Sequence, residues 1–509
     1  MSRRRKILIV VGIILGVAVL IPVIRHYQLR FAVANYIAEL KAKGEPMELA
    51  QVIPLPVPPE QNGAPFITNA LSRLDAEGNY AKSILLKNPP YAMSKAIPGK
   101  RMISWQQPLI HDSDDRSPTN TWEDLGFELN EWKSELTQLR SLIKRPILDF
   151  NLDYDISGSK DNGYKNLRLK RLSQFKLAAQ WLAASSLYNL HQGKPAEACA
   201  DVRTLLALVK GEADERVEIS QLVRIAIAQI AVGATWDVLQ ATNVSDADLA
   251  KLQQDWQSLG FIPQMNNAFL FERLHMLQIN DQLRHSPADL QNWIYTPDKT
   301  NFFGKLVGGI STKWDGFQWR WFWSYQDEVR GLQMWQLMFE GTQILNTNNS
   351  FQTAQSFVNA SFSKLGFDST KDDPYTFFSR DANQLPALHK AVNVEVARSV
   401  VIVAIALKRY ELRHQQLPAT LEELTPEFLP SVPIDCMDGQ PLRYRRNADG
   451  TFLLYSVGAN GVDDGGDPSL EKNVTSSNHY WQNDHALDWV WPQPATPEEI
   501  KNYYAQPPK

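Results

Sequence analysis

The sequence contains only two cysteines among its 509 residues, Cys199 and Cys436. Two thiols cannot form a four-cysteine zinc site, and a disulfide between them would require two distant segments to meet. Cys199 lies on an apolar helical pattern, and Cys436 lies in a proline-rich segment. We therefore predict two buried free thiols, with a disulfide as the alternative.

The sequence also lacks the short motifs of several enzyme classes. It has no glycine-rich phosphate loop, no Gly-x-Ser-x-Gly elbow and no His-Glu-x-x-His zinc pair. A formal net charge of −4 gives no basic footprint, so nucleic acid is not expected as a partner. Nine scattered histidines and many carboxylates leave one alternative open, a hydrolase assembled from distant residues.

An uncharged apolar run covers residues 7–24 and follows four cations, Arg3, Arg4, Arg5 and Lys6. The run is long enough for a transmembrane helix, and the cations favour a cytoplasmic N-terminus. A cleaved signal peptide is the alternative, but no small-x-small cleavage site follows the run. We predict that residues 1–24 form a cytoplasmic tail and an uncleaved single-pass anchor, with the rest of the chain outside the cytoplasm.

The chain after the anchor divides by pattern into a stalk and a helical body. Residues 28–43 form an amphipathic pattern that Gly44 ends, and the proline-rich residues 54–59 indicate an extended spacer. We predict a stalk over residues 25–63 that lifts the protein off the bilayer. Residues 64–385, called the body below, carry apolar residues at helical spacing without a fixed repeat.

Within the body, residues 314–325 read WDGFQWRWFWSY. We interpret this segment as a helix packed on all sides, because aromatic stripes usually fill cores. A ligand-stacking platform and a contact with a bilayer surface are the alternatives.

Residues 386–491, called the head below, follow a different pattern. Residues 392–414 predict a buried helix with a broad apolar face. Thr420 and Glu423 have the spacing of a capping box for a short helix. Alternating apolar residues on either side of Asp449-Gly450 predict a β-hairpin over residues 442–456. The proline-bearing tail, residues 492–509, is expected to pack loosely.

The second strand of that hairpin leads into YSVGANGVDDGGD. Asn460, Asp463, Asp464 and Asp467 place oxygen atoms among four glycines, and hard cations such as calcium prefer oxygen ligands. The sequence therefore offers these four residues as candidate calcium ligands. A solvated acidic turn is the alternative, because the twelve-residue calcium-loop pattern is absent.

The run ALKRYELRHQQLPATLEELTPEFLPSVPIDCMDGQPLRYRR, with FLLYSVGANGVDDGGD after it, resembles the globular head of the major pseudopilin of type II secretion systems. The positions in the same order are Ala406, Leu407, Tyr410, Pro418, Leu421, Leu424, Pro433, Asp435, Gly439, Pro441, Tyr444, Tyr455, Ser456, Gly458 and Gly461. The resemblance implies an α+β fold and calcium binding. Asn460 stands where the family has aspartate. The family's Gly-Phe-Thr-Leu-x-Glu leader is not found, so polymerisation as a pilin is not expected.

Together these patterns predict a mainly α protein with an N-terminal transmembrane helix, an α-helical body and a small pseudopilin-like α+β head. The expected function is that of a bacterial envelope protein anchored by one span in the inner membrane. Its role would be scaffolding, assembly or binding of a protein partner, related to secretion or pilus-like systems. The alternative is an envelope hydrolase with an active site in the body.

Overall fold

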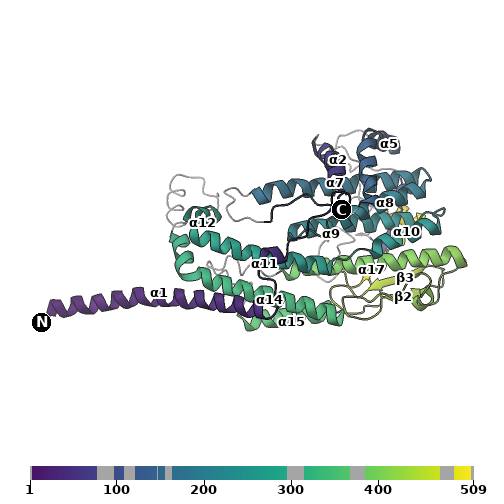
Figure 1. Cartoon of the computed structure of the whole chain (residues 1–509). Coiled ribbons are helices and arrows are strands. Elements are labelled where there is room, and N and C mark those ends of the chain that lie inside the picture. Colours follow the sequence, from purple (N-terminus) through teal and green to yellow (C-terminus); the bar gives the residue numbers. More distant parts are fainter. Residues whose placement is uncertain are drawn as a thin grey trace.

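The computed structural model describes residues 3–76, 97–107, 121–145, 147–154, 163–294, 314–366, 384–470 and 486–505. The described chain is mainly α-helical, as predicted (Figure 1). Its helices are α1 (Arg3–Ala42), α2 (Ala64–Ala76), α5 (Trp122–Glu131), α6 (Lys133–Arg140), α7 (Gly163–His191), α8 (Pro195–Gly211), α9 (Glu218–Leu239), α10 (Asp246–Gln257), α11 (Ile262–His285), α12 (Pro287–Ile294), α14 (Ser324–Asn348), α15 (Phe351–Lys364), α17 (Leu385–His414) and α18 (Pro497–Ala505).

Helix α17 lies between the helices of the body and the strands of the head. It packs against α9, α10 and α11 on one side and against α15 and β3 (Phe452–Ser456) on the other. Every residue from Ser399 to Leu407 is buried, so this stretch turns no face toward solvent. The predicted broad apolar face is thus a helix covered all round, which joins body and head in one hydrophobic core.

The predicted hairpin is confirmed. Strand β2 (Arg443–Arg446) pairs antiparallel with β3, and Tyr444 lies opposite Leu454. Strand β4 (Trp489–Val490) adds to the other edge of β3, giving a three-stranded sheet in the order β2-β3-β4. The turn is closed by the Asn447 amide, which donates to the carbonyl of Thr451 at 2.8 Å.

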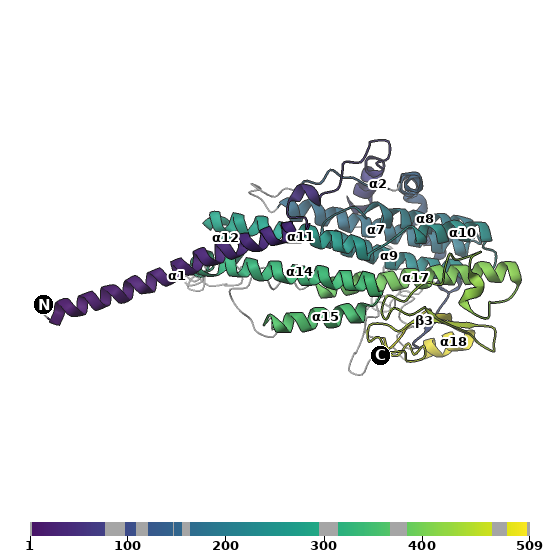
Figure 2. The same cartoon turned by 60° about the horizontal axis from the view of Figure 1, so that its bottom comes forward.

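Two predictions about the C-terminal part were wrong. The 3₁₀-helix η6 (Leu421–Leu424) has Thr420 at its N-cap without a side-chain capping bond, and Glu423 accepts a hydrogen bond from the Tyr410 hydroxyl at 3.1 Å. The tail is not loose where it is described. Strand β5 (Gln493–Pro494) pairs in parallel with β1 (Lys100–Arg101), and α18, drawn in yellow in Figure 2, is tied to the same segment by Glu499, which lies 3.7 Å from Lys100.

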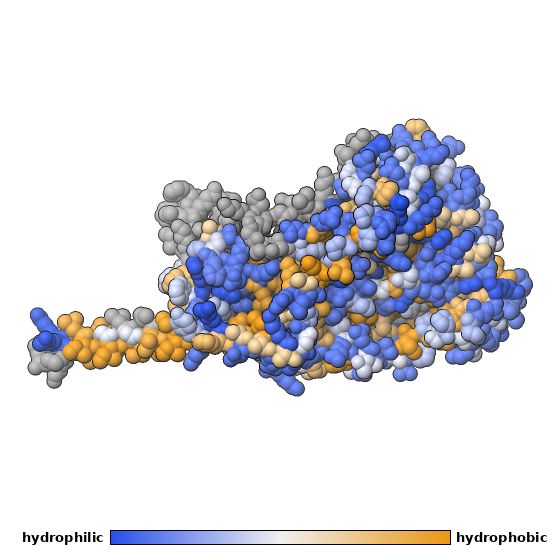
Figure 3. All heavy atoms as spheres, viewed as in Figure 1, coloured by the Kyte–Doolittle hydropathy of each residue, from blue (hydrophilic) through white to orange (hydrophobic). Residues whose placement is uncertain are grey.

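Helix α1 changes character along its length. Its N-terminal half projects from one end of the molecule with its apolar side chains exposed (Figures 1 and 3). The large side chains exposed between residues 7 and 24 are Ile7, Leu8, Ile9, Val10, Val11, Ile13, Ile14, Val17, Leu20, Ile21, Val23 and Ile24. The C-terminal half packs on α14 and buries Val33 and Leu40.

The residues predicted as a stalk do not stand apart from the body. Beyond the buried half of α1, Glu45 pairs with the buried Arg273 of α11 at 3.1 Å. Val52 is buried in a small apolar cluster with Phe271 of the same helix. Residues 25–63 therefore run along the helices instead of lifting them, because their apolar stripe finds partners on α11 and α14.

Among the described residues, one helix has the length and hydropathy of a membrane span, and it is α9. Its apolar window is 78% buried within the protein, where α7, α8, α11 and α17 surround it. Helix α9 therefore serves as a core helix of the bundle.

Both cysteines are free, as predicted. Cys199 of α8 is buried, and burial raises the pKa of its thiol to about 12. Cys436 is partly buried, and its sulfur lies 3.8 Å from the carbonyl oxygen of Val392.

A buried carboxyl at the C-terminal end of α8 makes the stability of the bundle depend on pH. Burial raises the pKa of Glu212 from 4.5 to about 6, although Arg171 and Arg224 act to lower it. Because the folded protein binds this proton more tightly than the unfolded chain, ionised Glu212 destabilises the fold, and that cost disappears as pH falls from about 6 to 4.5.

We expect Glu212→Gln to increase the free energy of unfolding by about 2 kcal/mol near pH 8, following the size of the shift. The gain should vanish below the ordinary carboxyl range. Unfolding by urea of the full chain in detergent, followed at several pH values, measures it. Glu131→Gln, at an exposed position of α5, is the control and should change little. A gain that is the same at all pH values would contradict the assignment.

Candidate functional site

The candidate site is the acidic loop, residues 457–467, which follows β3. Val457 enters it fully buried, and its amide donates to the Asp435 carboxylate at 3.0 Å. Gly458 then takes a φ of +66°, and a Cβ there would lie 3.0 Å from the carbonyl oxygen of Leu487. Only glycine fits this left-handed position at such a close approach. The loop is thereby held against the segment that leads into β4.

Asp488 organises the backbone of the loop from within. Its carboxylate is buried and accepts hydrogen bonds from the amides of Asp464, Gly466 and Asp467 at 3.4, 2.7 and 3.0 Å. Burial raises the pKa of Asp488 more than these amides lower it. Three donors on one carboxylate fix the path of a segment that is rich in glycine and otherwise costly to order.

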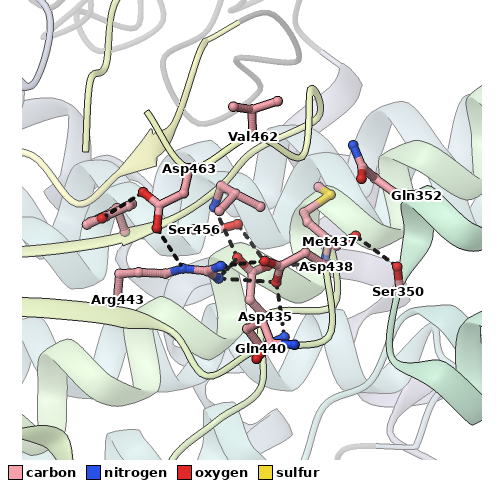
Figure 4. Close-up of polar contacts among 12 residues, drawn as sticks. Ser350, Gln352, Asp435, Met437, Asp438, Gln440, Arg443, Ser456, Val462 and Asp463 are labelled. Carbon is pink, nitrogen blue, oxygen red and sulfur yellow. Dashed lines mark hydrogen bonds and ion pairs between the residues drawn. The ribbon is translucent and has the colours of Figure 1, made fainter. Parts of the chain in front are cut away.

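A guanidinium lies among three carboxylates beneath the loop (Figure 4). Arg443 of β2 lies 3.0 Å from Asp435, forms two hydrogen bonds with Asp438, and lies 3.5 Å from Asp463. Asp435 is fully buried and also accepts the Ser456 hydroxyl at 2.9 Å. Burial raises the pKa of Asp435, although hydrogen bonds to backbone amides and to Ser456 act to lower it.

The structure brings two of the four predicted calcium ligands into direct contact. The Asn460 side-chain amide donates to the Asp464 carboxylate at 3.0 Å, and the Asn460 oxygen accepts from the Val462 amide. The Asn460 carbonyl oxygen is also engaged, because it accepts a hydrogen bond from Gln352 of α15 at 2.6 Å. These oxygen atoms already have donors within the protein.

The other two predicted ligands turn toward different partners. Asp463 accepts the Tyr455 hydroxyl at 2.9 Å and the Gly465 amide at 3.0 Å. Slight burial acts to raise the pKa of Asp463, but these donors and Arg443 lower it overall. Asp467 accepts from Ser469, whose hydroxyl and amide lower its pKa. Both carboxylates are thus stabilised in their ionised form by groups of the chain.

The oxygen atoms of the loop suit a hard cation, but the four predicted ligand side chains do not converge on one point in the described arrangement. The four side chains offer oxygen atoms of the kind calcium prefers. Within the described ranges, no group of three or more His, Cys, Asp or Glu side chains is placed to hold a metal ion. Calcium binding here would replace some of the internal hydrogen bonds, and it stays a prediction.

Two contributors to this site were not identified from the sequence. Arg443 is one of three arginines in the strand Arg-Tyr-Arg-Arg, and no local pattern marks it as the one that faces the carboxylates. Gln352 comes from α15, more than a hundred residues before the loop. The amides of Phe351 and Gln352 donate to the carbonyls of Cys436 and Met437, so the start of α15 is docked beside the loop.

Three buried acids of the body each pair with an arginine from another segment. Asp201 is paired with Arg140, Asp237 with Arg101, and Glu328 with Arg284. Burial raises the pKa of all three carboxyls, and the paired arginine lowers it in each case. Each pair links two separate segments of the fold. We therefore interpret these carboxyls, with their perturbed pKa values, as members of structural ion pairs.

Comparison with known proteins adds no relative at this point. No family model matches the chain, and neither a curated protein nor a solved structure matches it. The resemblance of the head to pseudopilins therefore depends on the residues quoted from the sequence.

The calcium prediction can be tested by thermal unfolding of the full chain. We expect millimolar calcium to raise the unfolding midpoint, because an ion that binds only the folded loop stabilises it by mass action. Asp463→Ala and Asp467→Ala should each reduce the rise. Magnesium should raise the midpoint less, since it demands a tighter octahedral shell. An unchanged midpoint, or equal responses in wild type and both variants, would leave the loop a solvated turn.

Arg443 allows a second test of the same loop. Arg443→Gln removes the cation beside Asp435, Asp438 and Asp463, so we expect it to destabilise the protein by about 1–3 kcal/mol without calcium. The substitution should also enlarge the rise of the unfolding midpoint in calcium, because the three carboxylates then repel one another and a bound cation would relieve that repulsion. Arg445→Gln, at an exposed position of the same strand, is the matched control. Two variants that respond alike to calcium would contradict a competition between guanidinium and ion.

Proposed function

We propose that the protein is anchored in the bacterial inner membrane by α1 and holds its body and head on the extracytoplasmic side, in a scaffolding, assembly or binding role. The observation that carries this proposal is the exposed apolar half of α1 (Figure 3). Burying one Val, Leu or Ile side chain is worth roughly 1.5–3 kcal/mol. Twelve such side chains in water would cost more than the net stability of a typical domain, which is about 5–15 kcal/mol.

The dimensions of the exposed segment also favour a bilayer. Residues 7–24 in a helix rise by about 27 Å, close to the roughly 30 Å of a hydrocarbon core. The cations at residues 3–6 precede the segment and favour a cytoplasmic N-terminus. The remainder of the chain follows on the opposite side of that segment. This orientation places body and head outside the cytoplasm.

The head is proposed as pseudopilin-like in fold. Its order of elements supports this proposal, since the end of α17 is followed by η6, the β2-β3 hairpin and the acidic loop. Helix α17 contacts β3, and Leu407 of α17 and Leu454 of β3 are both fully buried. A pseudopilin-like arrangement of helix and hairpin would bring these two residues together with Tyr410 and Phe452, which are partly buried.

A binding role for the head is supported by its position and surface. The sheet and the acidic loop lie at the end of the molecule opposite the exposed half of α1 (Figures 1 and 2). Val462 in the loop and Ile434 before the hairpin expose 56% and 41% of their surface. Apolar side chains exposed on the end far from the membrane are available to a protein partner of the envelope.

The topology prediction is tested with reporters. A reporter that works only in the cytoplasm should be silent when fused after Lys509 and active when fused before Met1, because the apolar run and its cations predict an N-in, C-out span. Activity of the C-terminal fusion would overturn the orientation and the envelope assignment with it. The second fusion shows that the reporter itself folds on this protein.

Photo-crosslinking tests whether the head binds a protein partner. A photo-crosslinking residue at Val462 should trap a protein partner in intact cells, whereas the same residue at Phe127 of α5, which exposes 67% of its surface, should not. The adducts are purified after detergent solubilisation and identified by mass spectrometry. Equal capture at both positions, or none at Val462, would argue against the head as the binding surface.

A further inference from the structure

We propose that an aromatic stripe of Trp314, Phe317 and Trp321 lies in the headgroup region of the bilayer that α1 spans, and so fixes the orientation of the body. The inference rests on the anchor proposed above and goes beyond it. It assigns a second membrane contact, made by the body, and names the lipid surface as what covers these side chains.

The stripe is continuous and exposed. Trp314, Phe317 and Trp321 expose 58%, 46% and 48% of their surface. Their ring centroids are 5.7 Å apart between the first two and 6.4 Å apart between the second and third. Helical residues 314–318 lead into the π-helix η5 (Trp319–Trp323), so Trp314 and Phe317 precede η5 and Trp321 lies within it.

The same segment has an inner face that holds it to the body. Trp319 is fully buried, and its indole nitrogen lies 3.3 Å from the Asp327 carboxylate. The expectation of a helix packed on all sides therefore holds for Trp319 and was wrong for the outer stripe. A buried tryptophan on one face and exposed rings on the other make a fixed platform.

The stripe lies at the level where the apolar run of α1 ends. His26, two residues after that run, has a ring nitrogen 2.9 Å from the carbonyl oxygen of Trp321, and the two rings lie 5.5 Å apart. Arg25 lies over the ring of Trp323 at 5.6 Å and donates to Gln326. Both views place the start of α14 at the end of the body from which α1 projects (Figures 1 and 2).

These contacts decide between the possible occupants of the stripe. A bilayer that takes up residues 7–24 must have its water interface close to His26, and hence to Trp321. Tryptophan is enriched at that depth, because its ring is apolar while its N–H bonds to headgroups and water. A protein partner at the same place would first have to displace lipid. The geometry therefore points to the lipid interface.

The sequence offers a direct test, because α1 contains no tryptophan and the first of the fifteen is Trp105. In liposomes containing the full chain, quenching of tryptophan fluorescence by brominated lipid reports on contact between body and bilayer alone. We expect lipid brominated near the headgroup to quench more than lipid brominated near the methyl ends. Trp314→Phe with Trp321→Phe should remove most of this quenching while keeping the apolar surface, and Trp122→Phe should not.

Flotation of the same liposomes separates the two proposals. A chain that does not float with lipid overturns the anchor and this inference together. A chain that floats but shows no lipid-dependent quenching, or equal quenching in the double variant, overturns only the inference. If Trp314→Ser with Phe317→Ser and Trp321→Ser instead dissociates an oligomer of a floating, unquenched protein, the stripe contacts a second copy and the lipid assignment is wrong.

Discussion

The all-round burial of α17 is the constraint on which the rest of the structure depends. The stretch from Ser399 to Leu407 can leave water on every side only if the helical body and the head are both in place. Its C-terminal end is fixed further by Arg409 and Arg413, which both pair with Asp246 at the start of α10. Head and body are therefore expected to unfold together, since removing either would expose one side of the same helix.

The carboxylates in and around the acidic loop are stabilised by separate groups of the chain and do not share one central partner. Asp488 collects three backbone amides, and Arg443 lies among three carboxylates. Repulsion within the loop is thus relieved by groups of the chain itself. A calcium ion would bind here only if its interaction with the loop oxygens were stronger than the hydrogen bonds that it replaces.

The sequence was informative where a structure depends on neighbours along the chain. Periodicity predicted the helix of residues 392–414, and Asp449-Gly450 predicted the hairpin, because both depend on spacing within a few residues. The predicted capping box is not formed, and Glu423 instead accepts a hydrogen bond from Tyr410, thirteen residues before it. The docking of residues 25–63 and the pairing of β5 with β1 depend on partners far along the chain. The same is true of Gln352 in the site, so local patterns could not predict it.

The continuity of α1 has a consequence for how the head would meet other molecules. The helix runs without interruption from its exposed apolar half to Leu40, which is buried against the body. If α1 spans a membrane as proposed above, a helical connection of this kind would let the head sweep a thin slab parallel to the membrane instead of the whole volume within reach of an unstructured tether. Molecules held at that height would encounter it at a raised effective concentration, and those held at other heights would rarely encounter it at all.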